Sequence, residues 1–298
     1  MKKNIAIVVP HKGIGDIIFH NSLIKSISKI YKTKILLFAN KSTKAALIYN
    51  NNKYVKQVVY IDLKRPSKIF YLFKIMSISL NLYQYQISKL YYTGNSKWHK
   101  MSLILLSIFK KINLKYINRK KKFIIPHLND LMIKCSVKNL NSYDPNISVN
   151  LSKKFYSKSK KLKKPWVFLS IDTSEDQIKI PTNTLIKIIN KLKKKYNTIF
   201  VNTSKKNFHK TEILRDSKLI KTSNFNILEI NFLIKNSRLF IGNESGPAVI
   251  ASISCKKSII FLGKNVIPES KKIPNKFKRE YIRIDNSHFN NAKILNII

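Results

Sequence analysis

The chain has 298 residues, of which 44% are hydrophobic, and its formal net charge is +44 from 58 Lys and Arg against 14 Asp and Glu. This length predicts two domains, and the apolar fraction excludes an intrinsically disordered chain. The two cysteines, Cys135 and Cys255, are far apart and form no CxxC motif, which indicates a reduced, cytoplasmic setting rather than a disulfide framework. The two most apolar stretches, 69–82 and 101–109, are shorter than the roughly 20 residues that span a bilayer, so we predict no transmembrane helix.

In the first half of the chain, residues 4–9 form a continuous apolar run, typical of a parallel strand that is buried on both faces. A turn follows over 10–16, and apolar residues spaced by three or four then predict a helix from 20 to 31. A strand at 34–38, a helix at 42–49 and a strand at 57–61 complete a βαβαβ pattern, with weaker strands at 86–91 and 115–117. This alternation predicts a doubly wound parallel sheet.

The second half repeats the alternation. We interpret the lysine-rich stretch 152–164 as the linker between domains 1–150 and 151–298. Strands are predicted at 166–170, 198–202, 239–241 and 258–262, and helices at 182–196, 227–236 and 247–253. The tail, 286–298, is a candidate terminal helix that packs back on the first domain.

The first of two glycine-bearing turns contains His11, Gly13, Gly15 and Asp16, and it joins a buried strand to a helix. It is neither a complete GxGxxG fingerprint nor a P-loop. Asp16 is the only acid in the first 61 residues. Two roles stay open for it: an acid in the first turn of a helix, interacting with the helix dipole, or a general base that accepts a proton from an attacking hydroxyl. For His11 the alternatives are a second titratable group of the site and an ordinary loop histidine.

The second turn reads Gly242-Asn243-Glu244-Ser245-Gly246-Pro247, between a predicted strand and helix. We expect Ser245 to cap the helix, whose free N–H groups and partial positive charge suit a diphosphate. Glu244 would repel phosphate, so we expect it to face sugar or ribose hydroxyls. The alternative is an ordinary strand-to-helix turn.

Together and in this order, the two turns resemble those of glycosyltransferase family 9, the heptosyltransferase-like family. Gly15-Asp16 matches the Gly-Asp turn at the end of the family's first strand, and residues 242–247 match its Gly-Asn-Asp-Ser-Gly-Pro turn. The likeness covers about residues 5–60 and 166–262. It implies a GT-B fold, in which two Rossmann-like, doubly wound parallel-sheet domains face each other across a cleft.

The resemblance also implies a reaction and its site. The acceptor would bind to the N-terminal domain, at the turn with His11, Gly13 and Gly15, and Asp16 would be the general base. Gly242, Asn243, Glu244, Ser245 and Gly246 would hold the diphosphate and sugar of the donor, a nucleotide-diphosphate sugar. The reaction would be inverting and would need neither metal nor cofactor.

Three positions depart from the family pattern. Glu244 stands where the family usually has Asp, and Val249 stands where a histidine is common. The Lys-x-Trp-Pro segment is reduced to Ile178-Lys179-Ile180-Pro181, so Lys179 takes the phosphate-steadying role only with an offset of one residue, and otherwise is a surface lysine. These departures leave the donor sugar open, together with the alternative of a catalytically inactive homologue that binds nucleotide or glycan.

The positive charge leaves two further alternatives. It favours a polyanionic partner, but nearly all basic residues are lysines in a chain also rich in Ile and Asn, which is typical of a compositional bias. A nucleic-acid-binding protein is the rival hypothesis, although we find no RNP-like, zinc-ligand or helix-turn-helix motif. Because the family's acceptors are lipopolysaccharide-core or other cell-envelope glycans, the resemblance implies a nucleotide sugar and a glycan or lipid-linked glycan as partners. Two readings stay open for basic and aromatic segments such as 68–74 and 110–122: peripheral contact with an anionic inner membrane, or solvated lysines on ordinary helices.

Overall fold

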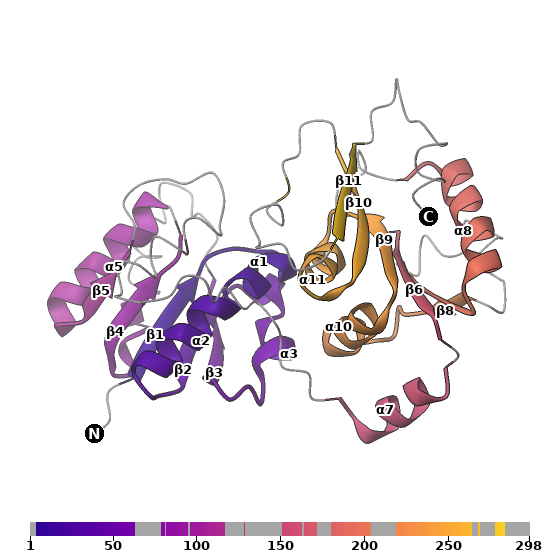
Figure 1. The fold of residues 1–298 in the computed structure, drawn as a ribbon. Coiled ribbons are helices and arrows are strands. Elements are labelled where there is room, and N and C mark those ends of the chain that lie inside the picture. Colours follow the sequence, from indigo (N-terminus) through magenta and orange to yellow (C-terminus); the bar gives the residue numbers. More distant parts are fainter. Residues whose placement is uncertain are drawn as a thin grey trace. The chain divides into compact units, whose positions relative to one another are not determined.

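Two separate parallel sheets form the framework of the computed structural model (Figure 1). The structure describes residues 4–62, 79–80, 82–94, 96–116, 128, 151–162, 164–171, 180–203, 219–263, 268 and 278–283. The chain divides into two compact units, Met1–Ile147 and Ser148–Ile298. In the described ranges, no helix is long and apolar enough to cross a membrane.

The first unit is built on a five-stranded sheet in the order β3-β2-β1-β4-β5, in which every pair is parallel. Its central strands are continuous apolar runs because both faces of the sheet are covered. The elements in chain order are β1 (Asn4–Val9), α1 (Ile14–Phe19), α2 (Asn21–Ile30), β2 (Ile35–Ala39), the 3-10 turn η1 (Lys41–Thr43), α3 (Ala45–Tyr49), β3 (Val55–Tyr60), β4 (Ile87–Tyr92), α5 (Lys97–Lys110) and β5 (Asn113–Lys115).

The second unit has a six-stranded parallel sheet in the order β11-β10-β9-β6-β7-β8. Helix α8 lies on one face and α10 and α11 lie on the other (Figure 1). The core side of α8 is apolar, and its buried residues there are Leu185, Ile188, Ile189 and Leu192. The elements are α7 (Lys153–Lys160), β6 (Trp166–Ser170), α8 (Thr182–Lys195), β7 (Thr198–Asn202), β8 (Leu219–Lys221), α10 (Ile227–Asn236), β9 (Leu239–Asn243), α11 (Gly246–Ser254), β10 (Lys257–Leu262) and β11 (Lys278–Arg283).

Most predicted elements are present with small shifts of their ends, and the helix predicted from 20 to 31 is α2. The sequence missed the short helix α1 before it, which joins α2 at His20. The backbone N–H of His20 donates to the carbonyl of Ile17, which tightens the chain at the junction. In place of the single helix predicted over 42–49, the structure has the 3-10 turn η1 followed by the short helix α3.

The predicted linker is partly a helix. Residues 153–160 form α7, and its Phe155 ring makes edge contacts with Phe225 and with Phe232 of α10, at centroid distances of 5.4 and 6.0 Å. The sequence did not predict this helix, because lysines at half of its positions obscured the aromatic pair Phe155 and Tyr156. Helix α5 and strands β8 and β11 were also missed, and the tail at 286–298 lies outside the described residues.

A glycine in β9 allows two strands to pack closely. A Cβ at Gly242 would lie 2.7 Å from the backbone oxygen and 2.8 Å from the Cβ of Ser170, which is its partner in β6. We expect Gly242→Ala to lower the stability by about 1–3 kcal/mol through overpacking, measured as a lower Tm.

The control is Gly13→Ala, in which the new Cβ meets only the end of the Asp16 carboxylate at 3.0 Å, and that group can rotate. Equal Tm values for the two variants would contradict this account of Gly242.

Candidate active site at the two switch points

In both sheets the strand order reverses beside the first strand. In the first unit the chain adds β2 and β3 on one side of β1, and β4 and β5 on the other. In the second unit the same reversal lies between β6 and β9. Ligands of open α/β sheets bind outside the carboxyl ends of the strands at such switch points. Both predicted turns lie there, since one follows β1 and the other follows β9.

Asp16 occupies the third position of α1 and is half-buried. Its Oδ2 accepts a hydrogen bond from the backbone N–H of Gly13 at 3.0 Å. Asp16 therefore has the structural role at the helix start that the sequence left open, but this role uses only its Oδ2. Among the residues that the structure describes, no hydrogen-bond partner is found for the other oxygen, so it remains available to a ligand.

A buried histidine anchors the backbone of this acid. His20 is fully buried, and its Nδ1 lies 2.7 Å from the carbonyl oxygen of Asp16, which can only accept, so Nδ1 carries a proton and donates. Nε2 lies 2.9 Å from the hydroxyl oxygen of Thr93, and the single proton of that hydroxyl also has the carbonyl oxygen of Val8 within reach, at 3.1 Å. Thr93 follows β4, and its N–H donates to Val8 of β1. His20 thus connects α1 to the strands on both sides of the switch point.

His11 lies beside Asp16 rather than in an open loop. Its ring centroid is 5.3 Å from that of His20, and its Nε2 is buried with no partner among the described residues. Burial lowers the pKa of His11, and the Asp16 charge and a hydrogen bond with the Thr93 backbone oppose this only in part. Near neutral pH the ring is therefore uncharged. The side chain of Asn40, after β2, donates to the carbonyls of Pro10 and His11 at 2.8 and 3.1 Å, which fixes this segment.

The glycines of this turn have a different role from the expected one. Scarce glycine suggested sharp bends, yet no glycine in the described ranges has a positive φ. Gly13 is the N-cap of α1 with an ordinary extended backbone, and Gly15 lies inside the helix. Gly13 supplies the backbone N–H that the Asp16 carboxylate accepts, and a Cβ there would lie 3.0 Å from that carboxylate.

At the second switch point, Asn243 bridges the two strands. It ends β9 and is fully buried, and its Nδ2 donates to the carbonyl of Ile171, just after β6. Its Oδ1 is buried without a partner in the part of the chain that is described. Such an atom is costly to leave unpaired, which favours an external donor such as a hydroxyl of a ligand.

Three polar residues beside Asn243 escaped the sequence analysis. The Nδ2 of Asn202 donates to the hydroxyl of Ser170 at 3.3 Å, and the hydroxyl of Thr222 lies 3.3 Å from the Oδ1 of Asn202. Ser170, Asn202 and Thr222 each end or directly follow a strand, and that shared position is the signal that would have found them. They extend the polar carboxyl edge of the sheet from β9 across to β8.

The start of α11 is open to an anion. Ser245 is at the N-cap position, but its hydroxyl donates back to the carbonyl of Asn243 at 3.0 Å, so the predicted side-chain cap is wrong. Gly246 begins the helix, and Pro247 has no N–H to offer. The first-turn N–H groups have no intrahelical acceptors, and they carry the partial positive charge of the helix dipole. Glu244 is half-buried beside them, and Lys179 lies outside the described residues.

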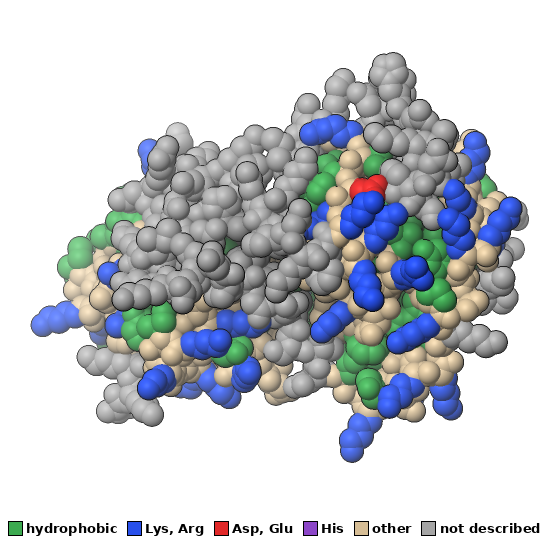
Figure 2. Space-filling model, viewed as in Figure 1, with side chains coloured by type: hydrophobic (Ala, Val, Ile, Leu, Met, Phe, Trp, Pro, Cys, Tyr) green, Lys and Arg blue, Asp and Glu red, His purple; other side chains and the backbone are tan. Residues whose placement is uncertain are grey.

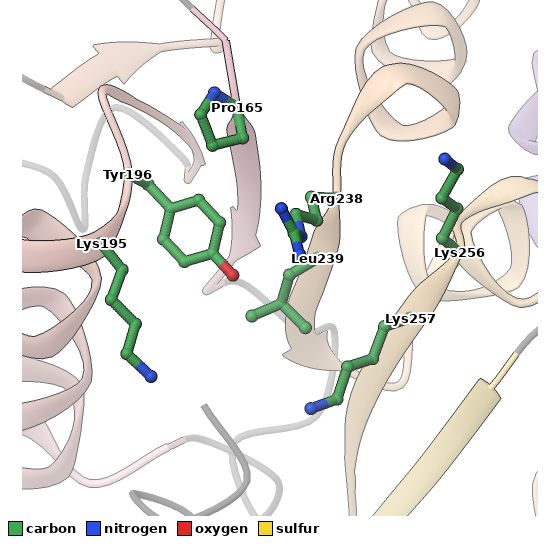
Figure 3. A pocket seen from close by; sticks show the side chains of 7 residues that line it. All are labelled: Pro165, Lys195, Tyr196, Arg238, Leu239, Lys256 and Lys257. Atoms are coloured by element: carbon green, nitrogen blue, oxygen red, sulfur yellow. The ribbon is translucent and has the colours of Figure 1, made fainter.

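A pocket of about 540 Å³ lies at the opposite, amino edge of the second sheet (Figure 3). Its cations are Lys195, Arg238, Lys256 and Lys257, which stand at or just after the last residues of α8, α10 and α11. Helix C-termini carry partial negative charge, so these cations complement the helices themselves. This pocket is therefore a poor candidate for the diphosphate, which needs helix N-termini.

Comparisons with known proteins agree with the fold. No family model and no curated protein matches the sequence. Among solved structures, a family 9 glycosyltransferase from Veillonella parvula matches with a TM-score of 0.73 and 10% identity, over 99% of this chain and 90% of that one. Escherichia coli heptosyltransferase WaaC, with ADP-2-deoxy-2-fluoro heptose, matches with a TM-score of 0.70 and 11% identity, over 98% of each chain. The predicted GT-B fold class, with two Rossmann-like parallel-sheet domains, is thereby confirmed.

The fold is also shared by an enzyme of another class. A UDP-GlcNAc 2-epimerase from Methanocaldococcus jannaschii matches with a TM-score of 0.58 and 12% identity, over 99% of this chain and 91% of that one. At these identities the likeness establishes the fold, and the chemistry has to be argued from the site. No group of three or more potential metal ligands is found in the described ranges.

The lowered pKa of His11 predicts how stability depends on pH. The unfolded side chain takes up a proton near pH 6.5, whereas the folded one resists it. The wild type should therefore lose stability as pH falls below about 6.5, until the pH reaches the lowered folded value. His11→Asn lacks this dependence, so the Tm of the wild type minus that of the variant should decrease between pH 7.5 and 5.

If that difference instead grows on acidification, the Asp16 charge outweighs burial and the pKa is raised. Parallel profiles would mean that His11 is freely solvated.

Proposed function

We propose that the protein is an inverting, metal-independent glycosyltransferase that moves a sugar, heptose or another, from a nucleotide-diphosphate sugar to a glycan acceptor of the cell envelope such as the lipopolysaccharide core. The observation that carries the proposal is the unused carboxylate oxygen of Asp16 at one switch point, in a chain whose other switch point offers a helix start suited to a diphosphate. Structures of this fold hold nucleotide sugars, including the heptose analogue in WaaC and UDP-GlcNAc in a Neisseria meningitidis epimerase.

In the proposed reaction an acceptor hydroxyl attacks the anomeric carbon of the donor sugar. The new bond joins the hydroxyl oxygen to that carbon, and the bond from the carbon to the diphosphate oxygen breaks. The free oxygen of Asp16 takes the hydroxyl proton, which raises the nucleophilicity of the attacking oxygen. The nucleoside diphosphate leaves with the electron pair, and the configuration at the carbon is inverted.

His11 supports this role because it stays uncharged. A charged imidazolium at this place would form an ion pair with Asp16 and would weaken it as a base. Burial keeps the pKa of His11 low and so preserves the carboxylate for the substrate. The buried bond from His20 to the Asp16 carbonyl holds the backbone of the base in place.

The donor would bind at the second switch point. The diphosphate is matched by the N–H groups at the start of α11, which attract anions. The unpartnered Oδ1 of Asn243 can accept from a donor hydroxyl, and Glu244 would do the same for the sugar or ribose. Lys179 would add positive charge to the leaving group.

An acceptor position is suggested by a pocket of about 770 Å³ in the first unit. It lies at the carboxyl ends of β2 and β3 and includes Asn40, which also holds the carbonyl of His11. The lining combines the apolar Leu47 and Tyr60 with two lysines, one carboxylate and other polar groups, which suits a glycan with many hydroxyls. We propose a cytoplasmic location for the reaction.

A catalytically inactive homologue that keeps the nucleotide site is the second candidate. Val249 lies half-buried in the second turn of α11 and offers no hydrogen bond where the related family often has histidine. The site gives no support to the nucleic-acid hypothesis, because the polar groups of the site lie at the carboxyl edges of the sheets.

Replacement of the base tests the mechanism. Asp16→Asn should reduce transfer by about 100-fold or more, because the amide cannot take the proton. Its oxygen can still accept from Gly13, so Tm and nucleotide affinity should be unchanged. Turnover is measured by product formation under saturating donor.

Glu229→Gln is the matched control, because Glu229 has the same capping position in α10 and accepts from the N–H of Asn226 at 2.9 Å. Normal transfer in the Asp16 variant would refute its role as base. A nucleotide sugar that is epimerised but not transferred would refute the transferase.

Nucleotide binding is tested by thermal shift with ADP, UDP, GDP and CDP, and with an RNA oligomer. A ligand at 100 times its Kd stabilises by about 2.7 kcal/mol, so one nucleoside diphosphate should raise the Tm clearly. Asn243→Ala should reduce this shift for the sugar conjugate. A shift with RNA alone would support the rival hypothesis, whereas binding of nucleotide without any turnover would support the inactive homologue.

A further inference from the structure

Helix α5 of the first unit is apolar on both of its faces. The inner face is buried through Leu103 and Leu106. The outer face carries Met101, Leu105 and, one turn on, Ile108 and Phe109, which are exposed by 53, 43, 67 and 79%. A surface helix normally turns polar residues to water, and one that is apolar all round is normally buried. The outer face of α5 therefore indicates a nonaqueous neighbour.

The exposed side chains form one continuous stripe. Their spacing of three and four residues places them on one side of the helix. Hydrophobic side chains are visible next to basic ones where α5 lies (Figures 1 and 2). Isolated exposed hydrophobic residues are common on protein surfaces, but a contiguous patch of this kind marks a site of interaction.

Positive charge borders the stripe. Lys97 and Lys100 lie at the start of α5, and Lys110 and Lys111 lie at its end. Lys110 also places its Nζ 3.5 Å from the ring centroid of the exposed Tyr83, which adds an amphipathic aromatic group to the border. From Asp62 to Asp130 the sequence contains no acidic residue.

We propose that the outer face of α5 is a docking surface for a bilayer that contains anionic lipid. The apolar stripe enters the boundary between headgroups and acyl chains, and the bordering lysines contact lipid phosphates and carboxylates. A second copy of this chain fits less well, because two such surfaces would bring their lysines together. The proposal does not depend on the transferase reaction.

The test is co-sedimentation of the whole protein with vesicles of phosphatidylglycerol and phosphatidylcholine, compared with phosphatidylcholine alone. Binding should require the anionic lipid and weaken as salt is raised from 50 to 500 mM. The double variant Ile108→Ser, Phe109→Ser should bind at least about tenfold more weakly, because it loses the most exposed apolar groups of the stripe. Lys110→Gln with Lys111→Gln should also bind more weakly to the anionic vesicles, because it removes two of the bordering charges.

The matched control is Ile30→Ser with Tyr156→Ser, which removes two exposed apolar groups that are 44 and 47% exposed and lie on α2 and α7. This control should bind as the wild type does. Equal loss in both double variants, or no loss in the α5 variant, would overturn the proposal. Two further results would overturn the proposal. A wild-type dimer that the α5 double variant dissociates, measured by light scattering, would assign the stripe to contact with a second copy. A large fall in the Tm of the α5 double variant would assign the stripe to packing against another segment of the same chain.

Discussion

The structure depends on the parallel pairing of strands whose order reverses beside the first strand of each sheet. The reversal sends the connections after neighbouring strands in opposite directions, so the backbone opens at their carboxyl ends. Both glycine-bearing turns lie there, whereas the central strands of each sheet are mostly buried apolar runs. The Asp16 turn and the Asn243 turn are the two results of this constraint.

At each switch point, buried side-chain hydrogen bonds join parts of the chain that are distant in sequence. In the first unit His20 and Thr93 join α1 to β1 and β4. In the second, Asn243 joins the end of β9 to the segment after β6. Buried hydrogen bonds of this kind stabilise modestly when they are complete and are costly when they are broken, so they hold each turn in one geometry. That geometry leaves an oxygen of Asp16 and the Oδ1 of Asn243 for a ligand.

The basic residues behind the large positive charge have different surroundings in three parts of the structure. At the amino edge of the second sheet, Arg238 and its lysine neighbours complement the C-termini of three helices (Figure 3). Around α5, lysines border an apolar stripe and point to a lipid surface. Elsewhere basic side chains are spread over the visible described surface with few acids among them, as compositional bias would produce (Figure 2). Net charge alone therefore identifies no partner, and only its combination with the neighbouring structure does.

The sequence by itself determined the fold class, most strands and the two turns, because continuous apolar runs and glycine-bearing strand ends are local signals. It placed Asp16 and Asn243 at the ends of strands, but their hydrogen bonds to Gly13 and Ile171 are seen only in the structure. Tertiary structure alone brought together His11, His20 and Thr93, which lie up to 82 residues apart in the chain, because strand order sets which loops meet. It also showed that the apolar outer face of α5 is exposed, since a hydrophobic run reads the same whether its neighbour is a core or a membrane.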